Sequence, residues 1–247
     1  MTDPMLIEVP ERIETARLVL RVPQRGDGAA VNAAVAETMT ELAPWLPWAG
    51  SMPTPDESEM HCRRQQARFI LREDLAMLMF ERRAGGGDGT PVGVGAEGRL
   101  VGDGVDGRLV GTSMKGGLVG ASMESRLVGA SMEGRLVGGL GLHRIDWPLG
   151  RFEIGYWRRA GFEGRGLVTE GVIAIARMAF DVLGARRVEI RMDDRNERSW
   201  KLAERAGFTL EAVLRFDATT LQGEPRSTRV YARVRGAEEP MALPRPA

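Results

Sequence analysis

The stretch RFEIGYWRRAGFEGRGLVTE, residues 151–170, decides how the rest of this chain is interpreted. Phe152, Ile154 and Tyr156 alternate with less apolar positions, and this period of two is typical of a β-strand. Glycines follow at positions 161, 164 and 166, and helical spacing of apolar residues then runs from Thr169 to Gly184. A glycine loop that opens a helix presents backbone N–H groups and a positive dipole end, so it predicts an anion site, usually for phosphate.

Composition narrows the class of protein. The 247 residues carry 34 basic and 34 acidic side chains, so no net charge directs the chain to nucleic acid or to an anionic membrane. Cys62 is the single cysteine, which excludes an intramolecular disulfide and fits a reducing compartment. The N-terminus lacks the form of a signal peptide, and no apolar run approaches the roughly 20 residues that cross a bilayer. We therefore expect a soluble cytoplasmic protein without nucleic-acid or membrane partners.

The same patterns predict the remaining elements. Residues 1–14 are expected to be a loose lead-in, and residues 237–247, with three prolines, a disordered tail. Between them we expect one domain over residues 15–236, with strands at 17–22, 75–82, 186–192, 209–216 and 228–235. Helices are expected at 27–39, 56–72 and 197–206, and Asn196 is a suitable N-cap for the last of these.

A nine-residue repeat lies between these elements. Five copies such as GRLVGTSMK (107–115) fill residues 98–142, and a degenerate copy precedes them at 89–97. The unit is far shorter than the roughly 20–50 residues of common repeat folds. We expect the last copy, 134–142, to form a core strand beside 151–158, with Leu136, Leu140 and Leu142 on one face. Residues 89–133 would be an insertion, either flexible or an extra meander, and His143 is expected to make a structural hydrogen bond.

The segment ELAPWLPWAG, residues 41–50, places two tryptophans between prolines, which excludes a regular helix interior. Two interpretations stay open. Trp45 and Trp48 either plug a corner between two helices or form a wall of the pocket for the acceptor substrate.

Four stretches in order resemble one family. TARLVLRV (15–22), ELAPWLPWA (41–49), FEIGYWRRAGFEGRGLVTEG (152–171) and DDRNERSWKLAERAGF (193–208) resemble the GNAT superfamily of acyl-CoA N-acyltransferases, in particular its RimJ/RimL-type group. That group acetylates N-terminal amines of ribosomal proteins and, in other members, small amines. The resemblance covers about residues 14–235 apart from the repeat. It implies an α+β fold in α/β/α layers, in which about four helices flank a mixed, mostly antiparallel sheet of about seven strands.

The resemblance also implies acetyl-CoA as co-substrate, without a metal, held where two parallel strands splay apart. Gly161 stands where the superfamily usually has Gln or Arg, so Arg159 and Arg165 are alternative sources of charge for the pyrophosphate. The implied cofactor-binding residues are Tyr156, Trp157, Arg158, Arg159, Gly161, Gly164, Arg165, Gly166, Leu167, Val168, Thr169 and Asn196.

The implied chemistry is direct attack of a neutral amine on the thioester, which requires a base for the ammonium and an acid for the departing sulfur. Glu153 matches a general-base position, with Asp217 as an alternative base, and Ser199 matches a proposed general acid. Each has a structural alternative: Glu153 could pair with an arginine on a half-exposed strand, and Ser199 could bond its own backbone.

Three functional classes follow. The first is an N-acetyltransferase that acts on a protein N-terminus or a small amine, as a monomer or a homodimer. The second is a non-catalytic module of the same fold that senses acetyl-CoA. The third, a Rossmann-type nucleotide-binding domain, is disfavoured because the loop lacks G-x-G-x-x-G.

Overall fold

The computed structural model describes residues 3–82 and 133–236, so the repeat copies before residue 133 and the tail lie outside the described residues. Eight strands form one sheet in the order β1-β2-β3-β4-β5-β6-β8-β7. The strands are β1 (Arg12–Glu14), β2 (Leu18–Arg21), β3 (Leu75–Glu81), β4 (Leu136–Asp146), β5 (Arg151–Arg158), β6 (Arg187–Asp193), β7 (Thr209–Thr219) and β8 (Pro225–Val234). The helices are α1 (Gly28–Leu42), α2 (Pro55–Ile70), α3 (Leu167–Arg177) and α4 (Glu197–Arg205), with short turns η1 (Pro4–Leu6), η2 (Pro47–Gly50) and η4 (Met178–Val182).

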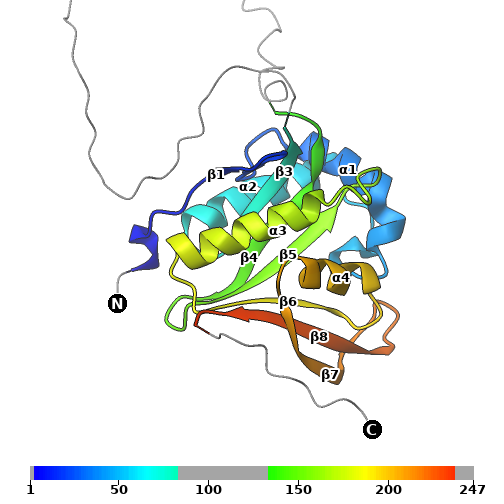
Figure 1. The fold of residues 1–247 in the computed structure, drawn as a ribbon. Coiled ribbons are helices and arrows are strands. Elements are labelled where there is room, and N and C mark those ends of the chain that lie inside the picture. Colours follow the sequence, from blue (N-terminus) through cyan, green and yellow to red (C-terminus); the bar gives the residue numbers. More distant parts are fainter. Residues whose placement is uncertain (1–2, 83–132, 237–247) are drawn as a thin grey trace, which may run out of the picture.

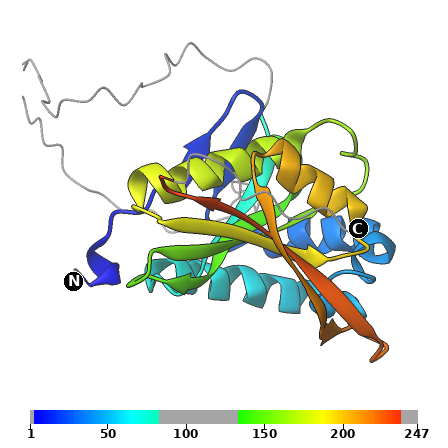
Figure 2. The same ribbon diagram turned by 60° about the horizontal axis from the view of Figure 1, so that its bottom comes forward.

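The helices cover the two faces of this sheet. α1 and α2 lie on one face, and α3 and α4 lie on the other (Figures 1 and 2). The larger apolar core packs α3 and α4 against the sheet, and the smaller core packs α1 and α2 around Leu78 and Phe80. This arrangement is the expected layered α+β fold. None of the helices within the described ranges is both long and apolar enough to cross a membrane.

The sheet has one strand more than expected. β1 lies inside the segment interpreted as a loose lead-in and pairs antiparallel with β2, with Ile13 opposite Leu20. A strand of three residues is too short to show a period in the sequence, which explains why the pattern did not predict it. The remaining strands lie where the sequence predicts them, within a few residues at each end.

β4 confirms the choice of the last repeat copy as a core strand, because it pairs with β3 on one side and β5 on the other. The expected common face of its leucines is wrong for Leu136. A bulge sets Phe80 opposite Leu136 and Met79 opposite Gly138, so Leu136 turns into the smaller core while Leu140 and Leu142 join the larger one. Gly138 has φ +154°, and a Cβ there would lie 2.2 Å from the carbonyl oxygen of Trp157. The bulge therefore depends on glycine.

The parallel pair of the sheet opens along its length. β5 and β6 are neighbours, but their ladder holds only at Arg151, Phe152 and Glu153, opposite residues 187–189. All other neighbouring strands are antiparallel. Beyond Glu153 the two strands separate, and β5 continues toward the glycine loop while still paired with β4 (Figure 1). The expected splayed parallel strands are therefore confirmed.

Candidate active site

The loop between β5 and α3 is an open anion nest. Gly161, Gly164 and Gly166 all have positive φ, between 67° and 81°. Gly166 is the N-cap of α3 and has no side chain to bond the first turn, so the N–H groups of residues 167–169 have no partner within the helix. A Cβ at Gly161 or Gly164 would meet nothing within 4 Å, which shows that the outer surface of the loop is unobstructed. Backbone N–H groups and a helix N-terminus therefore face open space together.

The arginines of this loop are paired with carboxylates. Arg159 binds Glu37 of α1 at 2.6 Å, Arg158 binds Glu41 at 2.9 Å, and Arg165 binds Glu81 of β3. These pairs attach the loop to α1 and to the sheet. The positive charge expected from Arg159 and Arg165 is therefore balanced within the protein, and the Arg135 guanidinium lies over the Phe162 ring of the same loop.

Glu163 places a carboxylate in the same loop. It accepts the Gly161 N–H at 3.1 Å and pairs with Arg158. The hydrogen bond from the backbone N–H of Glu163 to its own carboxylate is the main cause that lowers the pKa of Glu163. Arg158 and the Gly161 N–H act in the same direction. The loop thus already holds one anion, from its own chain.

Tyr156, Ser199 and Asn196 come together where β5 passes the start of α4. The Ser199 hydroxyl lies 2.8 Å from the Tyr156 phenol oxygen, and the Ser199 N–H donates to Asn196 Oδ1 at 3.1 Å. Burial raises the pKa of Tyr156 to about 12. Asn196 caps α4 as expected. The Ser199 hydroxyl is bound to Tyr156, so the alternative in which it bonds only its own backbone does not describe this structure.

Glu153 is the last β5 residue paired with β6, and its side chain is 16% exposed. Arg144 lies 3.3 Å from the carboxylate, so the expected pairing with an arginine is present. Burial nevertheless raises the pKa of Glu153, and the nearby Arg144 and Arg191 oppose this shift. Arg191 also lies 3.5 Å from Asp217. The two candidate bases therefore lie near one shared arginine.

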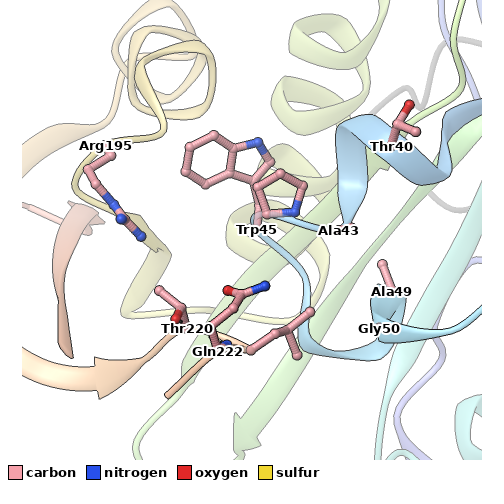
Figure 3. Close-up of a pocket in the computed structure, with 10 residues that line it drawn as sticks. Thr40, Ala43, Trp45, Ala49, Gly50, Arg195, Thr220 and Gln222 are labelled. Carbon is pink, nitrogen blue, oxygen red and sulfur yellow. Dashed lines mark hydrogen bonds between the residues drawn. The ribbon is translucent and has the colours of Figure 1, made fainter. Parts of the chain in front are cut away.

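The two tryptophans of the 41–50 segment have separate places. Trp45 lines a cavity of about 630 Å³ between the α1–η2 corner, the segment before α4, and the β7–β8 loop (Figure 3). Trp48 packs edge-on against Trp157, with ring centres 6.4 Å apart. Trp48 contacts a strand residue and is 48% exposed, so it does not plug a corner between two helices, and a role of Trp45 in binding the acceptor stays a prediction. Arg195 and Gln222 also line the cavity, and no sequence pattern singled them out.

One pair of residues was missed in the sequence. His143 Nδ1 lies 2.9 Å from Asp74 Oδ2, and His143 stands opposite Glu153 in the β4–β5 register. The expected hydrogen bond of His143 is therefore present, but its acceptor lies 69 positions away in the chain. Within residues 3–82 and 133–236, no group of three or more His, Cys, Asp or Glu side chains is arranged to hold a metal ion.

Comparison with known proteins agrees with this geometry. Residues 119–209 match the family model described as "Acetyltransferase (GNAT) domain". A Bacillus subtilis (strain 168) protein named "Putative ribosomal N-acetyltransferase YdaF" is 37% identical over 76 residues. That match covers 31% of this chain and 42% of the relative, so it spans less than half of either protein.

Solved structures share the fold over almost the whole chain. RimL, the ribosomal L7/L12 α-N-protein acetyltransferase in complex with coenzyme A, has a TM-score of 0.66 at 18% identity and covers 91% of this chain and 98% of its own. The microcin C7 self-immunity acetyltransferase MccE, in complex with acetyl-CoA and AMP, has a TM-score of 0.66 at 17% identity and covers 92% and 97%. These structures show that the chain has the fold of such acetyltransferases, and the family match covers residues 119–209 of it.

Proposed function

We propose that this protein transfers an acetyl group from acetyl-CoA to a primary amine. The observation that carries the proposal is the β5–β6 pair, which opens after Glu153 and leads directly into the glycine nest at the start of α3. A long, thin cofactor with a pyrophosphate at one end and a thioester at the other fits such a gap, since the nest takes the charged end. The acetyltransferase names of the relatives support the same activity.

The cofactor is proposed to bind along β5. The N–H groups of Gly164, Arg165, Gly166 and the first turn of α3 would hold the pyrophosphate, because a glycine backbone allows close approach of phosphate oxygens. Exposed β5 backbone after Glu153 has lost its β6 partner and would pair with the pantetheine amides. Asn196 and the Tyr156–Ser199 pair flank the same gap on the α4 side.

The amine is proposed to enter from the side opposite the cofactor, through the cavity lined by Trp45, Arg195 and Gln222. Its ammonium must lose a proton before nitrogen can attack the thioester carbon. Glu153 would act on that ammonium, either by taking its proton or by stabilising the positive charge of the group that takes the proton. When the carbon–sulfur bond breaks, the Ser199 hydroxyl would give the sulfur a proton and be resupplied, through Tyr156, with the second proton that the amine nitrogen loses.

Within this proposal the acceptor is a protein N-terminal amine, as for the RimL relatives, and a small amine is the alternative. We expect the enzyme to work in the cytoplasm as a monomer or a homodimer. One acetyltransferase domain over residues 15–236, interrupted by the insertion at 89–133, stays a prediction.

A turnover screen tests the function. The full-length protein is incubated with acetyl-CoA and either peptides that start with Ser, Ala or Thr or a panel of small amines and amino acids. Release of free thiol and acetylated product are both measured. We expect thiol release that depends on the amine. If acetyl-CoA binds and no amine in the panel promotes thiol release, the protein is a sensor of acetyl-CoA and the proposed activity is wrong.

A further inference from the structure

The imidazole of His143 lies flat over two facing glycines. Gly141 of β4 and Gly155 of β5 are register partners. A Cβ on Gly141 would lie 2.9 Å from the ring carbon Cε1, and a Cβ on Gly155 would lie 2.8 Å from Cδ2. Either methyl group would also come within about 3 Å of Nε2, at 3.0 Å and 3.1 Å. The ring therefore occupies the space that two side chains would otherwise fill, and both positions need glycine because of this close approach.

The two ring nitrogens have different surroundings. Nδ1 lies 2.9 Å from the Asp74 carboxylate, whose side chain is 14% exposed. An ionised carboxylate only accepts hydrogen bonds, so Nδ1 carries the proton and a neutral ring keeps its lone pair on Nε2. In the part of the chain that the structure describes, no hydrogen bond is made by Nε2. A base oriented by a buried carboxylate through its other nitrogen is the arrangement used for proton transfer in nucleophilic catalysis.

The free nitrogen lies over the β4–β5 ladder, near the residue at which β5 stops pairing with β6. Nε2 is over Gly155, two residues beyond Glu153, and Glu153 is the last residue of β5 that pairs with β6. The ring is on the same face of the sheet as Glu153, because His143 and Glu153 are opposite each other in register. A reacting group at the base of the gap would therefore meet Nε2 and the Glu153 carboxylate from one side.

We propose that Nε2 of His143, oriented by Asp74, accepts the proton of the acceptor ammonium, and that Glu153 stabilises the imidazolium that results. This proposal rests on the acetyl transfer proposed above and deepens it. The amine nitrogen loses two protons in forming the amide: one passes to Nε2 and then to solvent, and the other ends on sulfur through Ser199. One N–C bond forms, one C–S bond breaks, and no oxidant or reductant is needed.

Other charged groups set the field around this ring. His61 of α2 approaches Asp74, and Arg64 and Arg68 of the same helix lie near His61. On the strands, Arg144 pairs with Glu153, and Glu189 and Arg191 of β6 lie near Glu153. Asp74 and Glu153 are the two acids of this set that lie beside the ring, and Arg144 lies beside Glu153.

Two variants of His143 test the role. We expect His143→Ala to lower kcat/KM for the best peptide or amine of the screen by about 100-fold or more, within the range for a positioned base. Acetyl-CoA affinity should stay within about twofold, because the ring lies outside the glycine nest. Imidazole in the buffer should restore part of the rate to His143→Ala, whose cavity is empty, and not to His143→Gln, whose side chain fills it. Arg63→Gln, an exposed residue of α2, is the control and should keep wild-type kcat/KM.

The pH profile separates a chemical role from a structural one. The kcat/KM profile of His143→Gln should differ from that of wild type, because only the loss of a proton by the amine itself then remains to make kcat/KM rise with pH. Asp74→Asn keeps a hydrogen-bond acceptor and removes the charge, so it should lower kcat/KM while its folding is retained. A His143→Ala protein with nearly wild-type kcat/KM and an unchanged profile would overturn the proposal.

The tautomer offers a test that does not depend on turnover. The chain has two histidines, so nitrogen NMR of wild type and His61→Gln assigns the His143 ring directly. We expect a neutral ring with its proton on Nδ1. A proton on Nε2 in the neutral ring would refute the proposal. If no amine in the screen is acetylated, the proposed function fails, while the NMR result still decides whether His143 presents a basic Nε2.

Discussion

Removal of the Ser199 hydroxyl should slow the chemical step and leave the fold almost intact. Ser199→Ala deletes one hydrogen bond, the 2.8 Å contact with the Tyr156 phenol. Tyr156 can still donate to the Ser199 carbonyl oxygen, 3.2 Å away, so its buried hydroxyl is not left without an acceptor. A net hydrogen bond contributes about 0.5–1.5 kcal/mol. For a chain of this size, a loss of about 1 kcal/mol corresponds to a decrease in Tm of about 2–4 °C.

The effect on rate should be larger than the effect on stability. A thiol with a pKa near 8.5 leaves as a thiolate without much help at neutral pH. Protonation of the sulfur is therefore worth about tenfold to a hundredfold in kcat, the low end of general acid catalysis. Tyr156, whose pKa is raised to about 12, is protonated across the assay range, so it can pass a proton to Ser199 and take one back from the reacting nitrogen. Tyr156→Phe should then lower kcat less than Ser199→Ala, since the serine hydroxyl stays in place.

The assay is thiol release at saturating acetyl-CoA, measured from about pH 7 to pH 9, where an acid is needed less as the pH nears the pKa of the thiol. Ser58→Ala is the control, since Ser58 is a buried serine of α2 bonded to Asn32 and distant from the α4 start. A kcat for Ser199→Ala within twofold of wild type, with chemistry rate-limiting, would refute the acid role. If Ser199→Ala and Tyr156→Phe lose acetyl-CoA affinity to the same extent, the Tyr156–Ser199 pair binds the cofactor and does not supply the acid.

Three further outcomes are expected. Glu163→Gln should tighten acetyl-CoA binding by about two- to fivefold, because a half-exposed carboxylate no longer competes for the loop N–H groups. Glu197→Gln is an exposed control and should leave acetyl-CoA binding unchanged. Calorimetry measures the affinity of both variants. Since burial raises the pKa of Glu153, the folded state binds that proton more tightly than the unfolded chain, and the ionised group lowers stability above its folded pKa. Glu153→Gln should therefore raise Tm at about pH 7–8, and the gain should vanish as pH falls toward 4.5; an equal gain at both pH values would contradict this. Gly138→Ala should destabilise the fold by about 2 kcal/mol or more, because its Cβ would meet the Trp157 carbonyl oxygen at 2.2 Å, and denaturant unfolding that matches wild type would contradict it.

The sequence was most informative where a local pattern decides the structure. The alternation at 151–158, the glycine loop and the Asn196 cap each depend on neighbours in the chain, and the structure has them as predicted. The side of Leu136 could not be predicted, because the Gly138 bulge changes the period without leaving a sequence signal. A one-residue change of register moves a side chain to the other face of the sheet.

The sequence could not predict the long-range charge pairs, for a different reason. The partners of Arg159 and Arg165 lie 122 and 84 positions away, on α1 and β3. Asp74 and His143 meet only because β3 and β4 are neighbours, which sets Leu75 opposite Leu142 and brings the residues just beyond them together. Nothing in the local sequence of either residue marks them as partners. The strand order had to be known first.

The surroundings of the three candidate bases also differ, and the differences rank them. Asp217 lies 3.5 Å from Arg191, and that contact must weaken before a proton can be held on its carboxylate. Glu153 has a raised pKa, but its carboxylate lies 3.3 Å from Arg144, and that contact must weaken before a proton can be held there. His143 has its orienting partner on Nδ1 and its lone pair on Nε2, so it can accept a proton without breaking an existing contact. A base that accepts a proton without first breaking a contact adds least to the activation barrier. We therefore expect the ammonium proton to pass to His143 in preference to Glu153 or Asp217.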